Sequence, residues 1–270
     1  MMPTTKEDRP GATFELESLP DADRIPAVAL ARIERRMRRL RQASANPTAD
    51  HRFCPICDTL SEAFLPAGIV PRPQALCPNC GSLERHRLTW CFLTSCTRLL
   101  QAPTRLLHFA PEACLAQAFR RAPGVRYLSA DIQPGAADVV ADIANLEFPD
   151  ASFDAIYCSH VLEHIADDAR AMRQMLRVLR PGGWALIALP VDFTKAASDE
   201  DPAASAEERL KRFGDTLHVR YYGCDVIQRL NAAGFLVSTF TGFHHLLSQE
   251  LQARITARSW ESFFLCTKKA

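Results

Sequence analysis

The sequence predicts an α/β domain built on a mostly parallel β-sheet, and three observations in the middle of the chain carry that prediction. Short apolar runs end three times in a polar residue, at Asp131, Asp142 and Ser159. Such runs are typical of parallel strands whose carboxyl ends build a ligand site. Beyond Ser159 the apolar residues recur with helical spacing. A Pro-Gly-Gly run at residues 181–183 then ends the predicted helix before another apolar strand.

Length and composition allow one large α/β domain together with a small accessory unit. The chain has 270 residues, of which 47% are hydrophobic and 23% charged, as in ordinary globular proteins. A net charge of +1 steers it neither to nucleic acid nor to a membrane. No apolar run approaches the roughly 20 residues of a membrane span, and residues 1–20 lack the apolar segment of a secretory signal. We therefore expect a cytoplasmic protein with no membrane contact.

Residues 1–50 are expected to form a polar tail followed by a basic helix at about residues 25–42. From Arg24 to Arg41 the chain has seven arginines against Glu34 alone. Such a helix can contact RNA phosphates, or it can be a solvated helix that pairs with acidic groups of the same protein. No aromatic residues alternate with the arginines, which favours the second interpretation.

Residues 51–81 contain two C-P-x-C pairs, and this spacing predicts a zinc ribbon. The four expected thiolate ligands are Cys54, Cys57, Cys77 and Cys80. Thiolates suit tetrahedral zinc, and four of them leave no open position on the ion, so the metal should be structural. The other six cysteines lie in apolar runs and are expected to be reduced core residues.

Residues 82–102 are expected to form a linking helix with Ser82 as its N-cap. The first turn contains Arg85, His86 and Arg87, whose positive charges oppose the helix dipole. One interpretation is that these groups face an anionic group on a substrate or on the next domain. The other is that Glu84 pairs with Arg87 and that the remaining side chains are solvated.

Four segments in order resemble the class I S-adenosylmethionine-dependent methyltransferases. They follow a strand that ends at Asp131, and they are Asp142-Ile143, residues 153–156, residues 160–165 and residues 179–183. None is specific alone, but their order and spacing are a strong signal. The resemblance covers roughly residues 105–268 and implies a Rossmann-like, seven-stranded, mostly parallel sheet with helices on both faces over residues 103–270. A subset of zinc-ribbon methyltransferases has a run similar to residues 77–87.

The resemblance implies where S-adenosyl-L-methionine binds. Asp131, followed by Ile132, would accept the ribose hydroxyls, while Asp142 would accept from the adenine amine and Ile143 would cover the ring. Members of the family usually have an acidic residue and a glycine-rich turn after the first strand. This chain departs from that pattern and has His108, Phe109, Ala110, Pro111 and Glu112 there. Small Ala110 still allows close approach to the cofactor, and Glu112 is a candidate for its ammonium group.

Methyl transfer requires a nucleophile aligned with the methyl group, and often a base that removes a proton. Ser159 and His160 end the fourth strand, where the sulfonium methyl should lie, so His160 is the first candidate base and His218 the second. Glu163 and His164 follow His160 at helical spacing and either orient it or pack in the helix. The expected substrate-positioning residues are Arg85, His86, Arg220 and Tyr221.

Three functions are open at this point. The first is a methyltransferase acting on an oxygen, nitrogen or carbon nucleophile of a small molecule. The second is an rRNA-type RNA methyltransferase, which steep salt dependence of RNA affinity would reveal. The third is a non-catalytic zinc-ribbon binding protein, which would not bind S-adenosylmethionine. Because the chain outside the basic helix is net acidic, the first is favoured.

Overall fold

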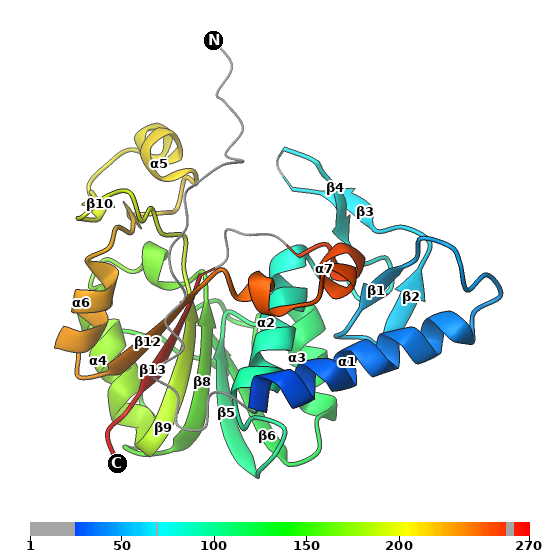
Figure 1. Cartoon of the computed structure of the whole chain (residues 1–270). Coiled ribbons are helices and arrows are strands. Elements are labelled where there is room, and N and C mark those ends of the chain that lie inside the picture. The colour runs from blue at the N-terminus through cyan, green and yellow to red at the C-terminus, as the bar shows by residue number, and fades with distance from the viewer. Residues whose placement is uncertain (1–24, 69, 258–261) are drawn as a thin grey trace.

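The computed structural model describes residues 25–68, 70–257 and 262–270 and shows a seven-stranded sheet at the centre of the protein (Figure 1). Its strand order is β12-β13-β9-β8-β5-β6-β7, and only β13 runs against its neighbours. The strands are β5 (Thr104–Phe109), β6 (Val125–Asp131), β7 (Val139–Val140), β8 (Phe153–Ser159), β9 (Leu179–Ala188), β12 (Leu236–Thr241) and β13 (Ser262–Thr267). The predicted seven-stranded, mostly parallel sheet is confirmed. The polar tail expected before residue 25 lies outside the described residues.

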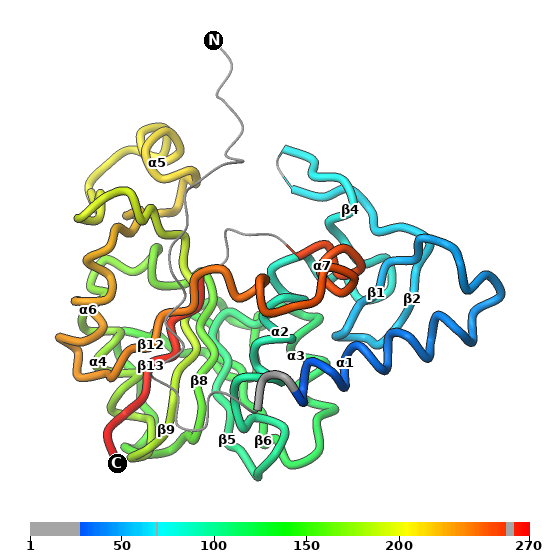
Figure 2. The backbone as a smooth tube through the Cα atoms, in the orientation of Figure 1, coloured from blue at the N-terminus to red at the C-terminus, as the bar shows by residue number. Residues whose placement is uncertain are grey.

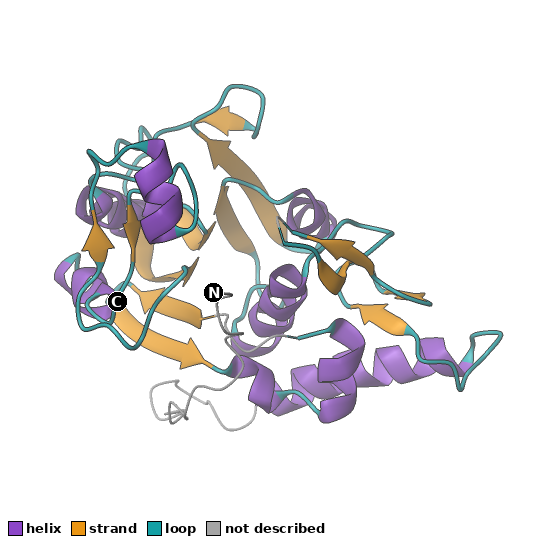
Figure 3. Ribbon diagram, turned by 90° about the horizontal axis from the view of Figure 1, so that it is seen from above, coloured by secondary structure: helices purple, strands orange, loops and turns teal. Residues whose placement is uncertain are grey.

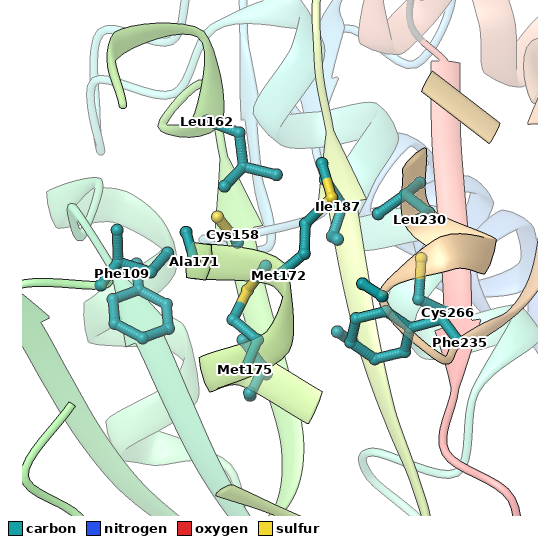
Figure 4. Close-up of a cluster of buried hydrophobic side chains, with 14 of the residues drawn as sticks. Phe109, Cys158, Leu162, Ala171, Met172, Met175, Ile187, Leu230, Phe235 and Cys266 are labelled. Carbon is teal, nitrogen blue, oxygen red and sulfur yellow. The ribbon is translucent and has the colours of Figure 1, made fainter. Parts of the chain in front are cut away.

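Helices cover both faces of the sheet (Figure 3). On one face, α4 (Asp168–Val178) and α6 (Val226–Ala232) pack their apolar residues against the strands. Figure 4 shows Met172 and Met175 of α4 over Cys158 and Ile187 of the sheet. The other face is covered by α1 (Ile25–Gln42), α2 (Glu84–Cys96), α3 (Ala113–Arg121) and α7 (Gln249–Ile255). Within the described residues, no helix has the length and apolarity needed to cross a membrane.

The predicted helix after Ser159 is present, but it begins later than the spacing indicates. A short 3₁₀ helix, η1 (Leu162–His164), comes first, and α4 begins after Asp167, whose side chain accepts a hydrogen bond of 2.9 Å from the Arg170 amide. The helix ends at Val178, as expected. The strand β9 begins at once and is irregular between Leu179 and Trp184, where a Cβ at Gly183 would lie 2.9 Å from the carbonyl oxygen of Arg180, so this part of the strand requires glycine.

The ribbon consists of two short hairpins, one formed by β1 (Arg52–Cys54) with β2 (Thr59–Ser61) and the other by β3 (Leu65–Ala67) with β4 (Arg72–Leu76). The ribbon packs against the rest of the protein. The strand β1 contacts α7 from the C-terminal part of the protein (Figure 2). Phe53 belongs to the same apolar cluster as Leu88 of α2 and Leu251 of α7.

Residues 195–209 are rich in Ala, Ser, Asp and Glu, a composition typical of a surface loop, but the segment contains regular structure. It contains β10 (Asp199–Glu200), paired with β11 (Arg220–Tyr221), and it enters α5 (Ala206–Phe213). Arg212 of α5 pairs with Asp199 at 2.6 Å and with Asp201 at 3.0 Å. Asp199 and Asp201 are therefore partners of an arginine in the following helix, a pairing that local composition does not reveal.

Candidate active site and cysteine cluster

The chain leaves β5 in one direction toward β6 and β7 and returns to β8 on its other side, so the carboxyl ends of β5 and β8 flank a switch point of the sheet. The residues that follow these two strands, Ala110 and His160, both have left-handed backbones, with φ of 47° and 52°. Their amides donate 2.9 Å hydrogen bonds to the carbonyls of Ala130 and Ala188 on the neighbouring strands. Backbone strain of this kind gathers at functional sites.

Glu112 lies just beyond the end of β5, immediately before α3. Its Oε2 is 2.8 Å from Nε2 of buried His108, whose Nδ1 is 3.0 Å from the Tyr127 hydroxyl. Burial alone raises the pKa of Glu112, but the hydrogen bond and charge of His108 outweigh it and hold that pKa below its usual value. The site therefore contains a carboxylate fixed in its anionic form.

Asp131 and Asp142 each shape a turn. Asp131 Oδ1 accepts from the Gln133 amide and Asp142 Oδ1 accepts from the Ala144 amide, both at 2.8 Å. Among the described residues, their Oδ2 atoms have no hydrogen-bond partner. Ile132 is 65% exposed, whereas Ile143 is 3% exposed and belongs to the core. Ile143, which was expected to cover the adenine ring, therefore lies in the core, and the exposed aliphatic side chain is that of Ile132.

The four predicted catalytic side chains are brought together at the rim. Nδ1 of His160 is 3.2 Å from Oε1 of Glu163, which is fully buried. The imidazole rings of His164 and His218 meet edge to face, with centroids 4.6 Å apart. Burial lowers the pKa of His218, which keeps its imidazole neutral near pH 7. Ser159, at the end of β8, is buried.

The first turn of α2 adds two of the predicted substrate-positioning residues to this rim. Nε2 of buried His86 is 3.8 Å from Oε1 of Glu112, and burial lowers the pKa of His86 to about 4. The half-buried Arg85 guanidinium makes no ion pair or hydrogen bond with any described residue. Ser82 does not cap the helix as expected, because its hydroxyl lies 3.2 Å from the Cys54 sulfur and α2 begins at Glu84.

Two arginines have roles that sequence reasoning did not identify. Arg220 is 2% exposed, and its guanidinium donates to the carbonyls of Leu162 and Ala166, both at 2.9 Å, and to Glu200 at 3.0 Å. The Arg220 guanidinium therefore holds η1 in place, and these contacts do not support the expected contact with a substrate. Tyr221, its neighbour in β11, is half-buried.

Arg87 is also fully buried, and its guanidinium donates to backbone carbonyls of the ribbon and of α7. Glu84 forms a two-point ion pair with Arg72 instead of pairing with Arg87. The only sequence signal for Arg87 was its position in the first turn of a helix, where the dipole disfavours a positive charge.

The four ribbon cysteines converge on one point, with every sulfur within 4.8 Å of the others. The Cys54–Cys80 and Cys57–Cys77 sulfur distances are 3.6 and 3.8 Å. A tetrahedral zinc ion with Zn–S bonds of about 2.3 Å requires sulfurs about 3.8 Å apart, so this set of donors fits zinc. The residue after each pair has a left-handed backbone, with φ of 59° at Asp58 and 71° at Gly81.

Residues 105–187, from β5 to the end of β9, match the family model described as "Methyltransferase domain". Over these residues the chain therefore has a methyltransferase domain. The matched segment includes the strands that lead to Glu112, Asp131, Asp142 and His160. The resemblance predicted from the sequence is therefore confirmed for this part of the chain.

Curated relatives of this chain are also named as methyltransferases. A protein of Mycolicibacterium smegmatis named "Probable S-adenosylmethionine-dependent methyltransferase" is 32% identical over 48% of this chain and 44% of its own length. Phosphoethanolamine N-methyltransferase 1 of Arabidopsis thaliana is 38% identical over 36% of this chain and 18% of its own. The chain thus spans less than half the length of these relatives. Among solved structures, YcgJ of Bacillus subtilis aligns with a TM-score of 0.45 and 19% identity, over 69% of this chain and 99% of its own.

Proposed function

We propose that this protein transfers a methyl group from S-adenosyl-L-methionine to an oxygen, nitrogen or carbon nucleophile of a small molecule. The observation that carries the proposal is the family match over residues 105–187, because it covers the strand ends where the carboxylates and His160 gather. Relatives named for phosphoethanolamine and for ubiquinone/menaquinone biosynthesis support a small acceptor. The cofactor supplies a methyl group already activated on a sulfonium sulfur.

Several features of the rim fit such a cofactor. The free oxygens of Asp131 and Asp142 are acceptors for hydroxyl and amine donors, and exposed Ile132 offers apolar surface to a ring. Ala110 combines a left-handed backbone with a small side chain, which lets a ligand approach as it would at glycine. The anionic Glu112 suits an ammonium group.

His160 is the group we assign to proton removal. Its strained backbone holds it at the end of β8, and Glu163 fixes its Nδ1. A histidine whose ring is oriented by a carboxylate is a typical general base. Arg85, without a partner among the described residues, is the group that would hold an anionic part of the acceptor.

The same proposal assigns structural Zn²⁺ to the ribbon and places the protein in the cytoplasm, since none of the ten cysteines forms a disulfide. The RNA alternative is less well supported. In α1, Arg36 pairs with Asp58 at 2.6 Å, and Arg38 and Arg41 both pair with Glu250. These contacts support the interpretation of a helix that pairs with the acidic body of the protein.

Asp131→Asn tests the cofactor site. The amide keeps the turn but loses one anionic acceptor, which is worth about 1.5–3 kcal/mol. We expect the Kd for S-adenosylhomocysteine, measured by titration calorimetry, to rise about 10- to 100-fold. Asp150→Asn is the control, because Asp150 lies before the opposite end of β8 and pairs with Arg177. If Asp131→Asn binds S-adenosylhomocysteine with unchanged affinity, Asp131 is not a cofactor-binding residue. If the wild type does not bind S-adenosylhomocysteine, the proposed function is wrong.

His160→Gln tests the base. We expect kcat to fall about 10²-fold or more while the Kd of the cofactor stays within a small factor, because a general base acts only on the reacting proton. The loss should shrink as the pH is raised, since hydroxide then replaces the missing base. If His160→Gln instead raises the cofactor Kd, measured without acceptor, and leaves kcat unchanged, His160 only shapes the binding site.

A further inference from the structure

A second set of metal-binding groups lies outside the ribbon, at the rim of the sheet. Glu163, His164 and His218 bring one carboxylate oxygen and two imidazole nitrogens within 4.8 Å of one another. The first two belong to η1, and the third lies two residues before β11. The sequence predicted these residues as catalytic or orienting groups, and nothing in it indicated that they form one ligand set.

The Glu163 carboxylate is fully buried, but only one of its two oxygens has a hydrogen-bond partner among the described residues. Oε1 is 3.2 Å from Nδ1 of His160, but buried Oε2 has no hydrogen-bond partner among the described residues. Burying an unpaired carboxylate oxygen is costly, and such atoms in folded proteins call for a specific explanation. A cation bound by Oε2 satisfies it, while His160 holds the other oxygen.

The two imidazoles are placed as ligands. Nδ1 of His218 is 3.2 Å from the Phe213 carbonyl oxygen, which can only accept, so Nδ1 carries the proton and Nε2 keeps its lone pair. Metal-binding histidines commonly have this second hydrogen bond, which fixes tautomer and ring orientation. The His164 ring meets that of His218 edge to face, at 4.6 Å between centroids.

The backbone holds the three residues in place. The Val219 amide donates a 2.9 Å hydrogen bond to the Glu163 carbonyl and so ties the two segments together. Arg220 holds the carbonyls around η1, and the Tyr222 hydroxyl donates to Asp168 at 2.8 Å. A site whose ligands are fixed by neighbouring contacts binds its ion without reorganising.

We infer that Glu163, His164 and His218 bind one divalent transition-metal ion of the Zn²⁺ or Fe²⁺ class. Two imidazoles and a carboxylate suit these ions, whereas Ca²⁺ and Mg²⁺ prefer oxygen ligands alone. Three protein ligands leave coordination positions open to water or to an oxygen of the acceptor. An acceptor hydroxyl bound there has a lowered pKa. This last step rests on the proposed methyl transfer, whereas ion binding does not.

Cobalt separates this site from the ribbon. Full-length protein stripped of metal is titrated with Co²⁺, and total binding is measured by equilibrium dialysis. Only the four ribbon thiolates give strong thiolate-to-cobalt absorption, so a site of nitrogen and oxygen ligands adds bound metal without adding to that band. We expect about two ions per chain for the wild type and about one for His218→Asn, with an unchanged thiolate band.

His245→Asn is the matched control, because it removes an exposed imidazole outside the cluster, and it should bind as the wild type does. His164→Asn should behave as His218→Asn does, and circular dichroism checks that both variants fold. The inference is overturned if the wild type binds one ion per chain, or if both variants keep the second ion. Calorimetry with S-adenosylhomocysteine on the same samples separates this failure from failure of the proposed function.

Discussion

Cys57→Ser is expected to release the ribbon metal and to unfold residues 51–81. The ribbon has strands of three to five residues, and its own buried apolar cluster consists of Cys54, Phe64 and Cys77. So small a core cannot offset the chain entropy lost on folding. Zinc binding to such modules is worth about 10–16 kcal/mol near neutral pH, and this binding energy is folding energy. Metal analysis and the rate of cleavage within residues 51–81 by a protease measure the loss.

Cys224→Ser is the control for this substitution. Cys224 is half-buried, and its thiol donates to the Phe193 carbonyl, far in sequence from the ribbon. Its replacement by serine should leave metal content and protease resistance unchanged. A Cys57→Ser protein that kept one ribbon metal per chain and resisted the protease like the Cys224 variant would contradict the structural-zinc proposal.

The loss of ordered structure should extend to the rim of the sheet, because the ribbon fixes the start of α2. The Ser82 hydroxyl contacts the Cys54 sulfur at 3.2 Å, and Arg72 of β4 forms its two-point ion pair with Glu84. The next two residues are Arg85 and His86. The ribbon therefore positions two side chains of the linking helix α2 at the rim of the sheet.

The features that could be predicted from the sequence are those that depend on a local pattern of residues. The strands ending at Asp131 and Ser159 and the helix stop before Gly183 follow from apolar period and turn residues, which a single segment contains. The cysteine cluster follows from ligand type and spacing. The structure brings the four candidate catalytic residues His160, Glu163, His164 and His218 together, while their catalytic role stays a prediction.

What could not be predicted depends on partners that are distant in the sequence. The partners of Arg220 are carbonyls around η1, and backbone acceptors leave no trace in residue type. Arg212 pairs with Asp199 and Asp201 and so orders a segment whose composition resembles a loop; composition does not show which carboxylate meets which arginine. Ile143 follows its carboxylate just as Ile132 does, and only packing distinguishes the core residue from the exposed one.

Arg87→Met is expected to lower the free energy of unfolding by about 3–5 kcal/mol. The guanidinium donates to the carbonyls of Ile255 at 2.8 Å and Ala75 at 3.0 Å and to the Thr256 hydroxyl at 2.6 Å. It also lies 4.3 Å above the Phe64 ring. Methionine fills similar space but leaves these buried acceptors unpaired. Because the acceptors belong to the ribbon and to the end of α7, the substitution should also loosen the ribbon from the catalytic domain.

Arg85→Met is the matched control, since it removes the same charge two residues earlier on the same helix. Arg85 makes no ion pair or hydrogen bond within the described part of the chain, so its loss should change stability by less than about 1 kcal/mol. Urea unfolding of the two variants gives the comparison, and Arg87→Lys should recover only part of the loss, because an ammonium cannot reach all the acceptors of a guanidinium. Equal unfolding midpoints for Arg87→Met and Arg85→Met would show that Arg87 does not join the ribbon to the domain. A fall in turnover confined to Arg85→Met would in turn separate the arginine that serves the acceptor from the one that serves the fold.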